Sequence, residues 1–249
     1  PARSDSPVTE SPEPAQTSGP TAAPRIRVGV SRCLLGEEVR FDGGHKRDRY
    51  VTDVLGPYFD WVPVCPEVEI GLSIPRPPIR LVEIEGAVRV RGVRDPDLDV
   101  TDALTGLYPR VAHRFSGVSG FILKRGSPSC GRERVKVCDE GGRSVGSGAG
   151  LFAEALRRDR PNLPVEEEGR LNDPRLRENF ITRVFAYRRW QDLRTGTVSV
   201  SALQGFHSRH KLLLLAHNQA GYRRLGPRVA AARPENLPQT LEAYEQGFM

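Results

Sequence analysis

Three cysteines of this chain each follow a short apolar run. Cys33 follows the run at 26–30, and Cys65 follows the run at 61–64. Cys130 follows the run at 120–123, after a basic pair and a Ser-Pro-Ser turn. Short apolar runs that alternate with helical segments are typical of buried strands in a parallel sheet. The carboxyl ends of such strands meet at one edge, where ligands bind in open α/β folds. The sequence therefore predicts three thiols at one edge of one sheet.

Composition divides the 249 residues into three segments. Residues 1–24 are rich in Pro, Ser, Thr and Ala and lack apolar periodicity, so we expect a disordered tail. Residues 25–193 alternate strand and helix patterns, which predicts an α/β domain with an open parallel sheet flanked by helices, Rossmann-like in type. Residues 194–249 are strongly helical. Their apolar faces need cover, so this segment should dock on the first domain, pair with another chain, or belong to a longer domain.

The pattern also predicts where individual elements lie. We expect a hairpin around Gly86 and a helix that begins at Asp173-Pro174 and runs to about Trp190. We further expect helices over 99–115 and 146–158. Beyond residue 199 we expect one helix that ends at Gly226-Pro227 and another that begins after Pro238.

Charge and cysteine usage indicate the compartment and the partners. The four cysteines are scattered without a disulfide framework, so we expect reduced thiols in a cytoplasmic protein. No apolar stretch approaches the roughly 18 residues of a membrane span, and no signal segment opens the sequence. The net charge of +6 is compatible with an anionic substrate or nucleic acid, and equally with arginine-rich solvent faces.

The three cysteines leave three interpretations open: zinc, an iron–sulfur cluster, or thiols that only pack. Three ligands are one fewer than a closed structural site requires. A metal held by only three protein ligands can accept a substrate atom at its open position. Cys138 follows the strand-like 135–137 stretch, and we interpret it as a non-ligand.

Several polar residues near the cysteines are candidates for chemistry. Glu67 lies two positions after Cys65 and is suited to proton transfer or to the activation of water. Ser127 and Ser129 bracket Pro128, and their hydroxyls could bind a substrate or a cluster sulfur. We add Asp42, with Arg40 beside it, and Lys124 to the candidate substrate-binding residues. For Asp42 and Arg40, an ordinary salt bridge is the favoured interpretation.

Three histidines, His207, His210 and His217, recur on one face of the predicted C-terminal helix. Metal binding is conceivable for such spacing. The segment around His207 and His210 is also dense in positive charge. We therefore expect a polar seam or a partner face rather than a metal site.

At these motifs the chain resembles the thiouracil desulfidase (TudS) family. The resemblance rests on four motifs in order and covers roughly residues 26 to 190. The motifs are Val30-Ser31-Arg32-Cys33-Leu34-Leu35-Gly36, Val39-Arg40-Phe41-Asp42-Gly43, Val64-Cys65-Pro66-Glu67, and Leu123-Lys124 followed by Ser127-Pro128-Ser129-Cys130-Gly131.

The resemblance implies a 4Fe-4S cluster held by Cys33, Cys65 and Cys130, with one open iron. It also implies catalytic roles for Glu67 and Ser127. The implied substrates are thiolated pyrimidines, as bases or nucleotides, which are converted to oxo forms with release of hydrosulfide. The alternative hypothesis is a non-catalytic zinc or cluster protein that binds RNA. We expect a small-molecule substrate, with nucleic acid less favoured and no membrane partner.

The stretch from Phe206 to His217, followed by Tyr222 and Leu225-Gly226, resembles the opening of the YbgA-like domain. Domains of that kind normally extend well beyond the point corresponding to Met249. The resemblance therefore implies that residues 194–249 are the beginning of such a domain, apparently truncated here.

Overall fold

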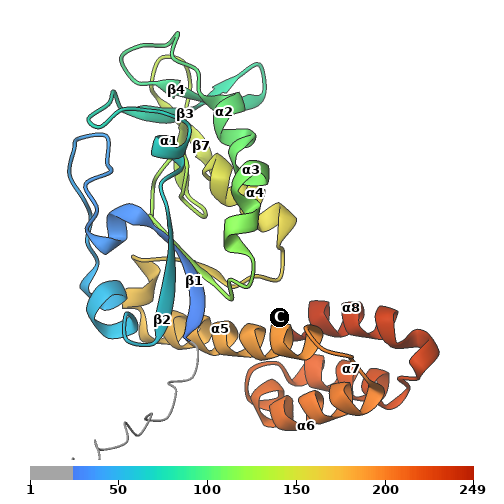
Figure 1. The fold of residues 1–249 in the computed structure, drawn as a ribbon. Coiled ribbons are helices and arrows are strands. Elements are labelled where there is room, and N and C mark those ends of the chain that lie inside the picture. Colours follow the sequence, from blue (N-terminus) through green and yellow to red (C-terminus); the bar gives the residue numbers. More distant parts are fainter. Residues whose placement is uncertain (1–24) are drawn as a thin grey trace, which may run out of the picture.

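The computed structural model describes residues 25–249, and the predicted disordered tail at 1–24 lies outside the described residues. Four strands form one parallel sheet in the order β2-β1-β5-β8 (Figure 1). Their bounds are β1 Ile26–Ser31, β2 Phe59–Val64, β5 Phe121–Leu123 and β8 Val165–Glu167. The α/β prediction of a parallel sheet flanked by helices and followed by a helical segment is confirmed.

Helices cover both faces of this sheet. On one face Phe121 and Val165 pack against Phe152 of α4 (Leu151–Asp159) and Tyr108 of α3 (Leu107–Val111). On the other face Val28, Val30 and Ile122 pack against two short helices and one long helix. These helices are η1 (Arg32–Leu35), η2 (Tyr50–Leu55) and α5 (Pro174–Arg194). Burial on both faces explains why β5 is apolar throughout, whereas β2 at the edge of the sheet leaves Asp60 exposed.

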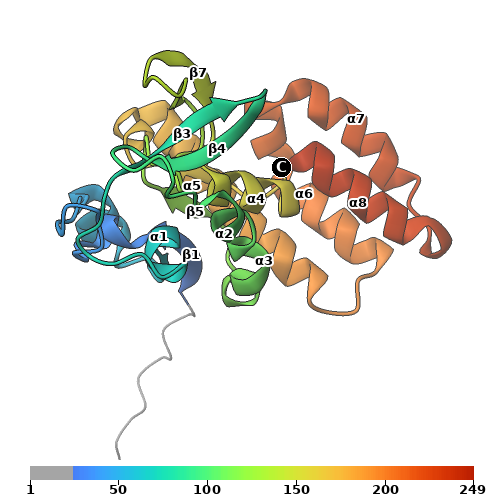
Figure 2. The same ribbon diagram turned by 90° about the horizontal axis from the view of Figure 1, so that it is seen from above.

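A second sheet stands at the end of the molecule opposite α5 (Figure 1), and Figure 2 looks down on the molecule from the end of this sheet. Its order is β4-β3-β6-β7, and its core contains Leu81, Val90 and Val137. The predicted hairpin around Gly86 is confirmed as the antiparallel pair of β3 and β4. The strands are β3 Ile79–Ile84, β4 Ala87–Gly92, β6 Val135–Cys138 and β7 Ser144–Gly148.

Two helix predictions in this half were wrong. The segment 99–115 does not form one helix but α2 (Thr101–Thr105), α3 and the 3₁₀ turn η3 (Ala112–Phe115). Gly106 and Pro109 interrupt the helical hydrogen bonding there. The glycine-rich stretch assigned to the start of the 146–158 helix instead forms β7 against β6, and α4 begins only at Leu151.

The C-terminal segment folds into three helices rather than the two expected. They are α6 (Val200–His217), α7 (Gln219–Ala230) and α8 (Leu237–Phe248). Asn218 ends α6 and accepts a hydrogen bond from the Gly221 amide, which divides the predicted long helix, while Pro227 is accommodated within α7. The helix predicted to end near Trp190 continues to Arg194.

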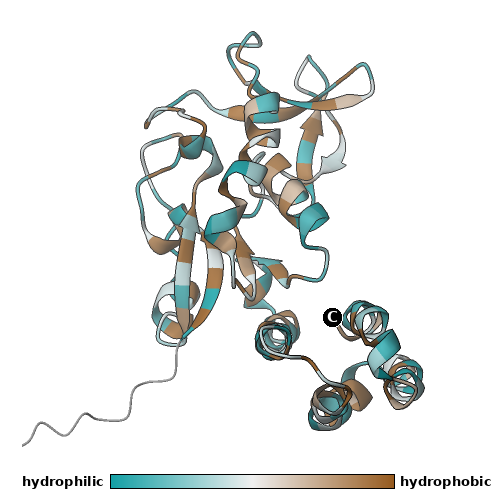
Figure 3. Ribbon diagram, turned by 45° about the vertical axis from the view of Figure 1, so that its right-hand side comes forward, coloured by the Kyte–Doolittle hydropathy of each residue, from teal (hydrophilic) through white to brown (hydrophobic). Residues whose placement is uncertain are grey.

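Helix α5 is shared by both halves of the protein. Its first turns pack Phe180 and Val184 on the parallel sheet, and its last turns place Trp190 among Phe206, Leu225 and Tyr244 of the C-terminal helices. Figure 3 looks down α5 to α8, which surround this common interior. The helical segment docks on α5 of the first domain, which is one of the three ways we considered to cover its apolar faces. Within residues 25–249 no helix is both long and apolar enough to cross a membrane.

Candidate metal centre and active site

A cavity of about 350 Å³ lies at the carboxyl ends of β1, β2 and β5. In sequence order the chain moves from β1 to β2 on one side of β1 and then to β5 on its other side, so β1 and β5 form the switch point of the sheet. This is the position where open α/β folds bind ligands. Cys33, Cys65 and Cys130 all line the cavity, as do Glu67 and Ser127. The structure therefore places together the three thiols that the sequence predicted at one edge.

Local structure positions each cysteine. Cys33 lies in the short helix η1, which ends at Gly36 with a φ of 98°, a conformation that favours glycine. Cys65 is the N-cap residue of α1 (Pro66–Glu69), where Pro66 occupies the first helical turn. Cys130 lies in a turn whose backbone touches Gly150, and a side-chain carbon at Gly150 would lie 2.5 Å from the Ser129 carbonyl carbon. Glycine is therefore needed there for the close approach.

The three thiols affect one another electrostatically. Burial first, and then a negative charge on Cys65, raise the pKa of Cys33 to about 11. Burial likewise raises the pKa of Cys130, whereas a hydrogen bond from Ser31 lowers it. These thiols therefore stay protonated in the free protein. A metal cation that replaces the protons would stabilise all three as thiolates.

Glu67 is fixed by two partners at the cavity wall. Its Oε2 accepts hydrogen bonds from Nε and Nη2 of Arg76 at 2.9 and 2.8 Å. Its Oε1 accepts a hydrogen bond from the Ser129 hydroxyl at 2.8 Å. Both Glu67 and Arg76 are buried, so these contacts are shielded from water and salt. The carboxylate thus has one oxygen committed to Arg76 and the other directed to the serine pair.

The two serines continue this hydrogen-bonded chain. The Oγ atoms of Ser127 and Ser129 lie 2.9 Å apart. The Ser127 hydroxyl also accepts from the backbone amide of Cys130 at 3.1 Å, which ties the chain to the cysteine turn. Hydroxyls connected in this way can move a proton between Ser127 and the Oε1 oxygen of Glu67.

Five further basic side chains line the cavity. They are Arg32, Arg40, Lys46, Lys124 and Arg125. Some of these charges are compensated: Arg32 pairs with Glu37, and Lys124 contacts Glu168. Among the described residues, Lys46 and Arg125 have no carboxylate within salt-bridge distance of their side chains. The wall therefore carries positive charge that an anionic ligand can use.

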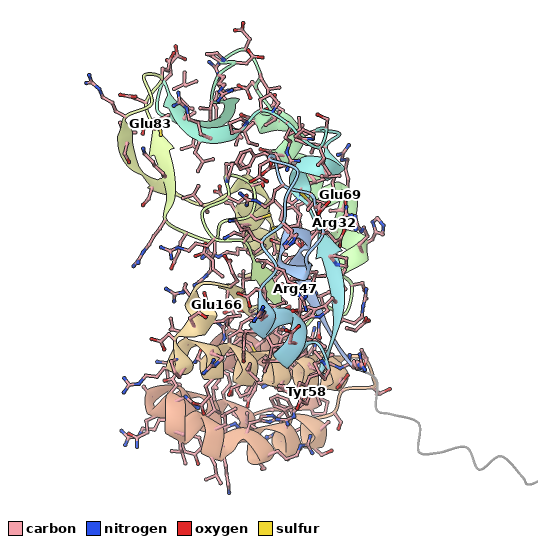
Figure 4. All side chains as sticks on the ribbon, turned by 90° about the vertical axis from the view of Figure 1, so that its left-hand side faces the viewer. Arg32, Arg47, Tyr58, Glu69, Glu83 and Glu166 are labelled. Carbon is pink, nitrogen blue, oxygen red and sulfur yellow. The ribbon has the colours of Figure 1, made fainter. Side chains whose placement is uncertain are left out.

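The other predicted residues lie as follows. Lys124 and Ser129 line the cavity, whereas Asp42 lies outside its lining. The Asp42 carboxylate accepts a hydrogen bond from the Gly44 amide at 3.1 Å and lies 3.4 Å from Arg40. Cys138 ends β6 in the second sheet and does not line the cavity. In Figure 4, Arg32 and Glu69 lie close together, while Glu83 marks the second sheet at the end opposite the C-terminal helices.

The three histidines do not form one site. His207 lies 3.1 Å from the Tyr244 hydroxyl through Nδ1. His210 is buried, lies 2.8 Å from the Phe206 carbonyl and stacks on the Phe206 ring. His217 lines a separate cavity between the helices. The expectation of a shared polar face is thus wrong for His210, because the aromatic interior of the helical segment surrounds it.

Arg76, which lines the cavity and binds Glu67, is the site residue that sequence reasoning missed. It stands between prolines in the stretch Pro75-Arg76-Pro77-Pro78, between the α1 segment and β3. An arginine in a proline-rich connection reads as a solvent-exposed loop residue. The only sequence signal for Arg76 is the length of the connection between α1 and β3, which is long enough to pass the cavity. A connection length does not identify the residue that Arg76 binds.

The donors that line the cavity are three thiols, the soft ligands that iron–sulfur clusters use. Within residues 25–249, no group of three or more His, Cys, Asp or Glu side chains is arranged to hold one metal ion. An iron–sulfur cluster instead spreads its cysteine ligands around several metal atoms. Three thiols on separate loops around a cavity of about 350 Å³ agree with such a group.

Comparison with known proteins finds two matching family models. The model described as 2-thiouracil desulfurase matches residues 28–168. A model described as a protein of unknown function (DUF1722) matches residues 211–249. The chain is similar to the uncharacterized protein YbbK of Bacillus subtilis (strain 168), with 30% identity over 150 residues, 58% of this chain and 97% of that protein.

Two further similarities divide between the halves of the chain. The uncharacterized protein YbgA of Escherichia coli (strain K12) is 36% identical over 77 residues, 30% of this chain and 46% of YbgA. This chain therefore spans about half of that relative. A solved structure described as a 4Fe-4S-dependent thiouracil desulfidase, TudS, is similar at 32% identity with a TM-score of 0.48, covering 64% of this chain and 99% of that one.

Proposed function

Because this chain belongs to the 2-thiouracil desulfurase family, we propose that it is a desulfidase that replaces the sulfur of a thiolated pyrimidine with oxygen from water. The observation that carries this proposal is the position of Glu67 in the same cavity as the three cysteines. A buried carboxylate with one oxygen directed to a serine pair is suited to activate water next to a metal centre.

Cys33, Cys65 and Cys130 would hold a 4Fe-4S cluster in this proposal. Three protein ligands would leave one iron without a protein donor, and this iron would supply a Lewis acid with affinity for a soft sulfur atom. Ser31 supports the arrangement from the protein side. Its hydroxyl hydrogen-bonds to Cys130 and accepts from the Lys124 amide at 2.9 Å, so it holds the turn against β1.

Glu67 and the two serines would manage the protons of the reaction. Water adds its oxygen to the ring carbon that carries sulfur, the carbon–sulfur bond breaks, and the products are the oxo-pyrimidine, hydrosulfide and a proton. Glu67 takes a proton from the attacking water at Oε1. Ser127 hydrogen-bonds the ring or transfers a proton to it, and Ser129 connects Ser127 to Glu67. The oxidation state of the ring carbon does not change, so no reductant is needed.

The cavity wall supports a nucleotide substrate. A flat pyrimidine must approach edge-on, because its sulfur has to reach the site between the thiols. Arg40, Lys46 and Arg125 at the wall would then meet a phosphate on the far side of the ribose. We therefore propose thiouridine monophosphate as a better substrate than the uncharged nucleoside. Lys124 and Ser129 complete the proposed substrate contacts.

The decisive experiment is anaerobic purification followed by metal and product analysis. We expect brown protein with about four irons and four acid-labile sulfides per chain. Incubation with 4-thiouridine monophosphate should release hydrosulfide and lose the absorbance of the thiolated base. A colourless protein that binds one zinc ion and leaves the nucleotide unchanged would contradict the proposal and favour a non-catalytic RNA-binding protein.

A second candidate substrate is a thiolated base within RNA. It is favoured by the stretch 193–234, which contains no Asp or Glu. The basic residues of this stretch are all exposed on the C-terminal helices and their connections: Arg194, Arg209, Lys211, Arg223, Arg224, Arg228 and Arg233. Such a surface can neutralise phosphates without reading sequence. We propose residues 25–193 as the desulfidase unit and 194–249 as a distinct helical unit to which this role would belong.

Competition between the two substrates decides between the candidates. A stacked base must be flipped out before its sulfur can enter the cavity, at a cost of a few kcal/mol. A higher kcat/KM for the mononucleotide would favour the desulfurisation of free nucleotides. A higher kcat/KM for intact thiolated tRNA, lost when Arg223, Arg224 and Arg228 are changed to Gln, would favour action on RNA.

A further inference from the structure

Arg76 is the guanidinium most deeply placed in the cavity wall, with 3% of its side chain exposed. We propose that Arg76 is a positioning residue that orients Glu67 so that only Oε1 faces the serine pair and the reacting water. This inference rests on the desulfidase function proposed above. It adds a role for a residue that never has to touch the substrate.

The hydrogen bonds divide the two oxygens of Glu67 between different tasks. Both Nε and Nη2 of Arg76 donate to Oε2, at 2.9 and 2.8 Å. Ser129 donates to Oε1 at 2.8 Å. Rotation of the carboxylate would break all three hydrogen bonds in a buried site, where an unpaired charge is costly. The carboxylate is therefore held in one orientation before any substrate binds.

Arg76 can impose this orientation because its own position is fixed by three carbonyls from two chain segments. Its amide donates to the Phe41 carbonyl at 2.8 Å, its Nη1 to the Ser73 carbonyl at 3.2 Å, and its Nη2 to the Val39 carbonyl at 3.0 Å. A planar guanidinium with several satisfied donors loses little further freedom when it binds a carboxylate. A lysine ammonium has neither the plane nor the number of donors.

The Val39 carbonyl extends the connection to the cysteine loop. It is the acceptor for Arg76 Nη2 and also lies 3.7 Å from Cys65 Sγ as a hydrogen-bond acceptor. Arg76 therefore contacts the neighbour of a proposed cluster ligand as well as the proposed base. Glu67 and Cys65 lie two residues apart on the same turn, so both lie beside the Val39 carbonyl and Arg76.

A purely structural salt bridge is the competing explanation, and a double-mutant cycle separates the two. The parent, Arg76→Ala, Glu67→Gln and the double variant are purified anaerobically and matched for iron content. We expect Arg76→Ala to lower kcat about 10²-fold with KM little changed, the size expected when a reacting group is misplaced. In the Glu67→Gln background, Arg76→Ala should lower kcat no further. Equal, additive losses in both backgrounds would contradict positioning through Glu67.

Chemical rescue gives a second readout that a structural role would not change. Guanidinium ions at concentrations below those that unfold the protein should restore part of kcat in Arg76→Ala, whereas sodium chloride at equal ionic strength should not. Arg114→Ala is the matched control. Arg114 binds Glu69, which lies on the same helix as Glu67, at 2.7 Å, but Arg114 does not line the cavity. It should keep the parent kcat and show no rescue. Arg76→Lys should retain the charge and the iron but recover only part of kcat.

An infrared measurement tests the carboxylate directly, without turnover. The carboxylate stretching bands of Glu67 are obtained as the difference between the infrared spectra of the parent and of Glu67→Gln. These bands should shift in Arg76→Ala and stay unchanged in Arg114→Ala. Unshifted bands together with a parent-like kcat in Arg76→Ala would overturn the proposal. An iron-loaded parent that fails to desulfurise any thiolated pyrimidine would contradict the proposed function instead, and the infrared result would still judge the positioning of Glu67. If Arg76→Ala does not fold, Arg76→Lys and Arg76→Gln serve in the same comparisons.

Discussion

The hydroxyl of Ser129 lies 2.8 Å from Oε1 of Glu67, although 62 positions separate the two residues in the chain. Glu67 follows β2, and Ser129 follows β5 of the same parallel sheet. Their contact joins the Glu67 helix turn to the Cys130 turn. It makes Glu67, Ser129 and Ser127 one hydrogen-bonded unit beside three thiols.

The first prediction concerns Glu67 itself. Glu67→Gln keeps the size and one acceptor oxygen of the side chain but removes the base. We expect the iron content and visible absorbance to match those of the parent, and kcat to fall by about 10²- to 10⁴-fold. Hydrosulfide release under anaerobic single-substrate conditions measures the effect. A fully active Glu67→Gln protein would rule out Glu67 as the base.

The second prediction tests the serine chain. Ser129→Ala removes the donor to Oε1 and breaks the connection to Ser127, so we expect kcat to fall while the iron content is unchanged. Ser119→Ala is the matched control. Ser119 is also buried and donates to Gln191 at 2.7 Å, away from the cavity. The control should lose about 1 kcal/mol of stability and retain its kcat. Equal kcat values in the two variants would remove Ser129 from the mechanism.

The third prediction separates the ligands from the remaining cysteine. Cys138 ends β6, outside the cavity lining. Cys138→Ser should therefore leave the iron count intact, whereas Cys33→Ser, Cys65→Ser and Cys130→Ser should each lose most of the iron. Iron and acid-labile sulfide are measured after anaerobic reconstitution. Loss of the cluster in Cys138→Ser would indicate a closed site with four thiolates and would contradict an open iron.

The fourth prediction concerns the phosphate. Arg125→Ala should raise KM for thiouridine monophosphate with little change in kcat, because a contact kept in both ground and transition states affects binding alone. KM for the uncharged nucleoside should not change. The advantage of the nucleotide over the nucleoside should also shrink as salt is raised. Equal kcat/KM values for the two substrates at every salt concentration would exclude phosphate recognition.

The fifth prediction is a pH dependence in the C-terminal helices. Burial lowers the pKa of His210 below its ordinary value of 6.5, and Arg189 and Arg209 add to this, while the Phe206 carbonyl opposes it. Below pH 6.5 the unfolded chain therefore binds more protons at this position than the folded protein does. The free energy of unfolding should fall as the pH drops from 6.5 through the lower folded pKa.

Urea unfolding of the parent and of His210→Gln from about pH 5 to about pH 7.5 measures this effect. The variant cannot take up a proton at residue 210, so its stability should depend less steeply on pH in this range. His207 remains in both proteins with a pKa lowered by burial and, to a lesser degree, by the charge on His210, so the comparison measures His210 together with this coupling. Identical slopes for parent and variant would show that His210 does not contribute.

Local sequence patterns determined the parallel sheet and the meeting of the cysteines at its edge. Strands buried on both faces are mostly apolar, and a residue that follows a strand of a parallel sheet lies at the carboxyl edge in any arrangement of the helices. This rule alone predicts that Cys33, Cys65 and Cys130 lie at one edge of the sheet. The same rule misplaced residues 146–148, because a glycine-rich strand at the edge of a sheet carries no apolar signal.

Tertiary structure alone decided which polar groups meet inside the cavity. Arg76 reaches Glu67 because the proline-rich connection returns over the cysteine turns and is held there by the carbonyls of Val39 and Phe41. Asp42, close to the same segment in sequence, turns away to Arg40 and Gly44. Hydrophobic periodicity is a property of a few neighbouring residues, whereas a buried hydrogen bond depends on the packing of distant loops. The sequence by itself therefore specified the edge where the three thiols meet, and only the packed chain specified the orientation of Glu67.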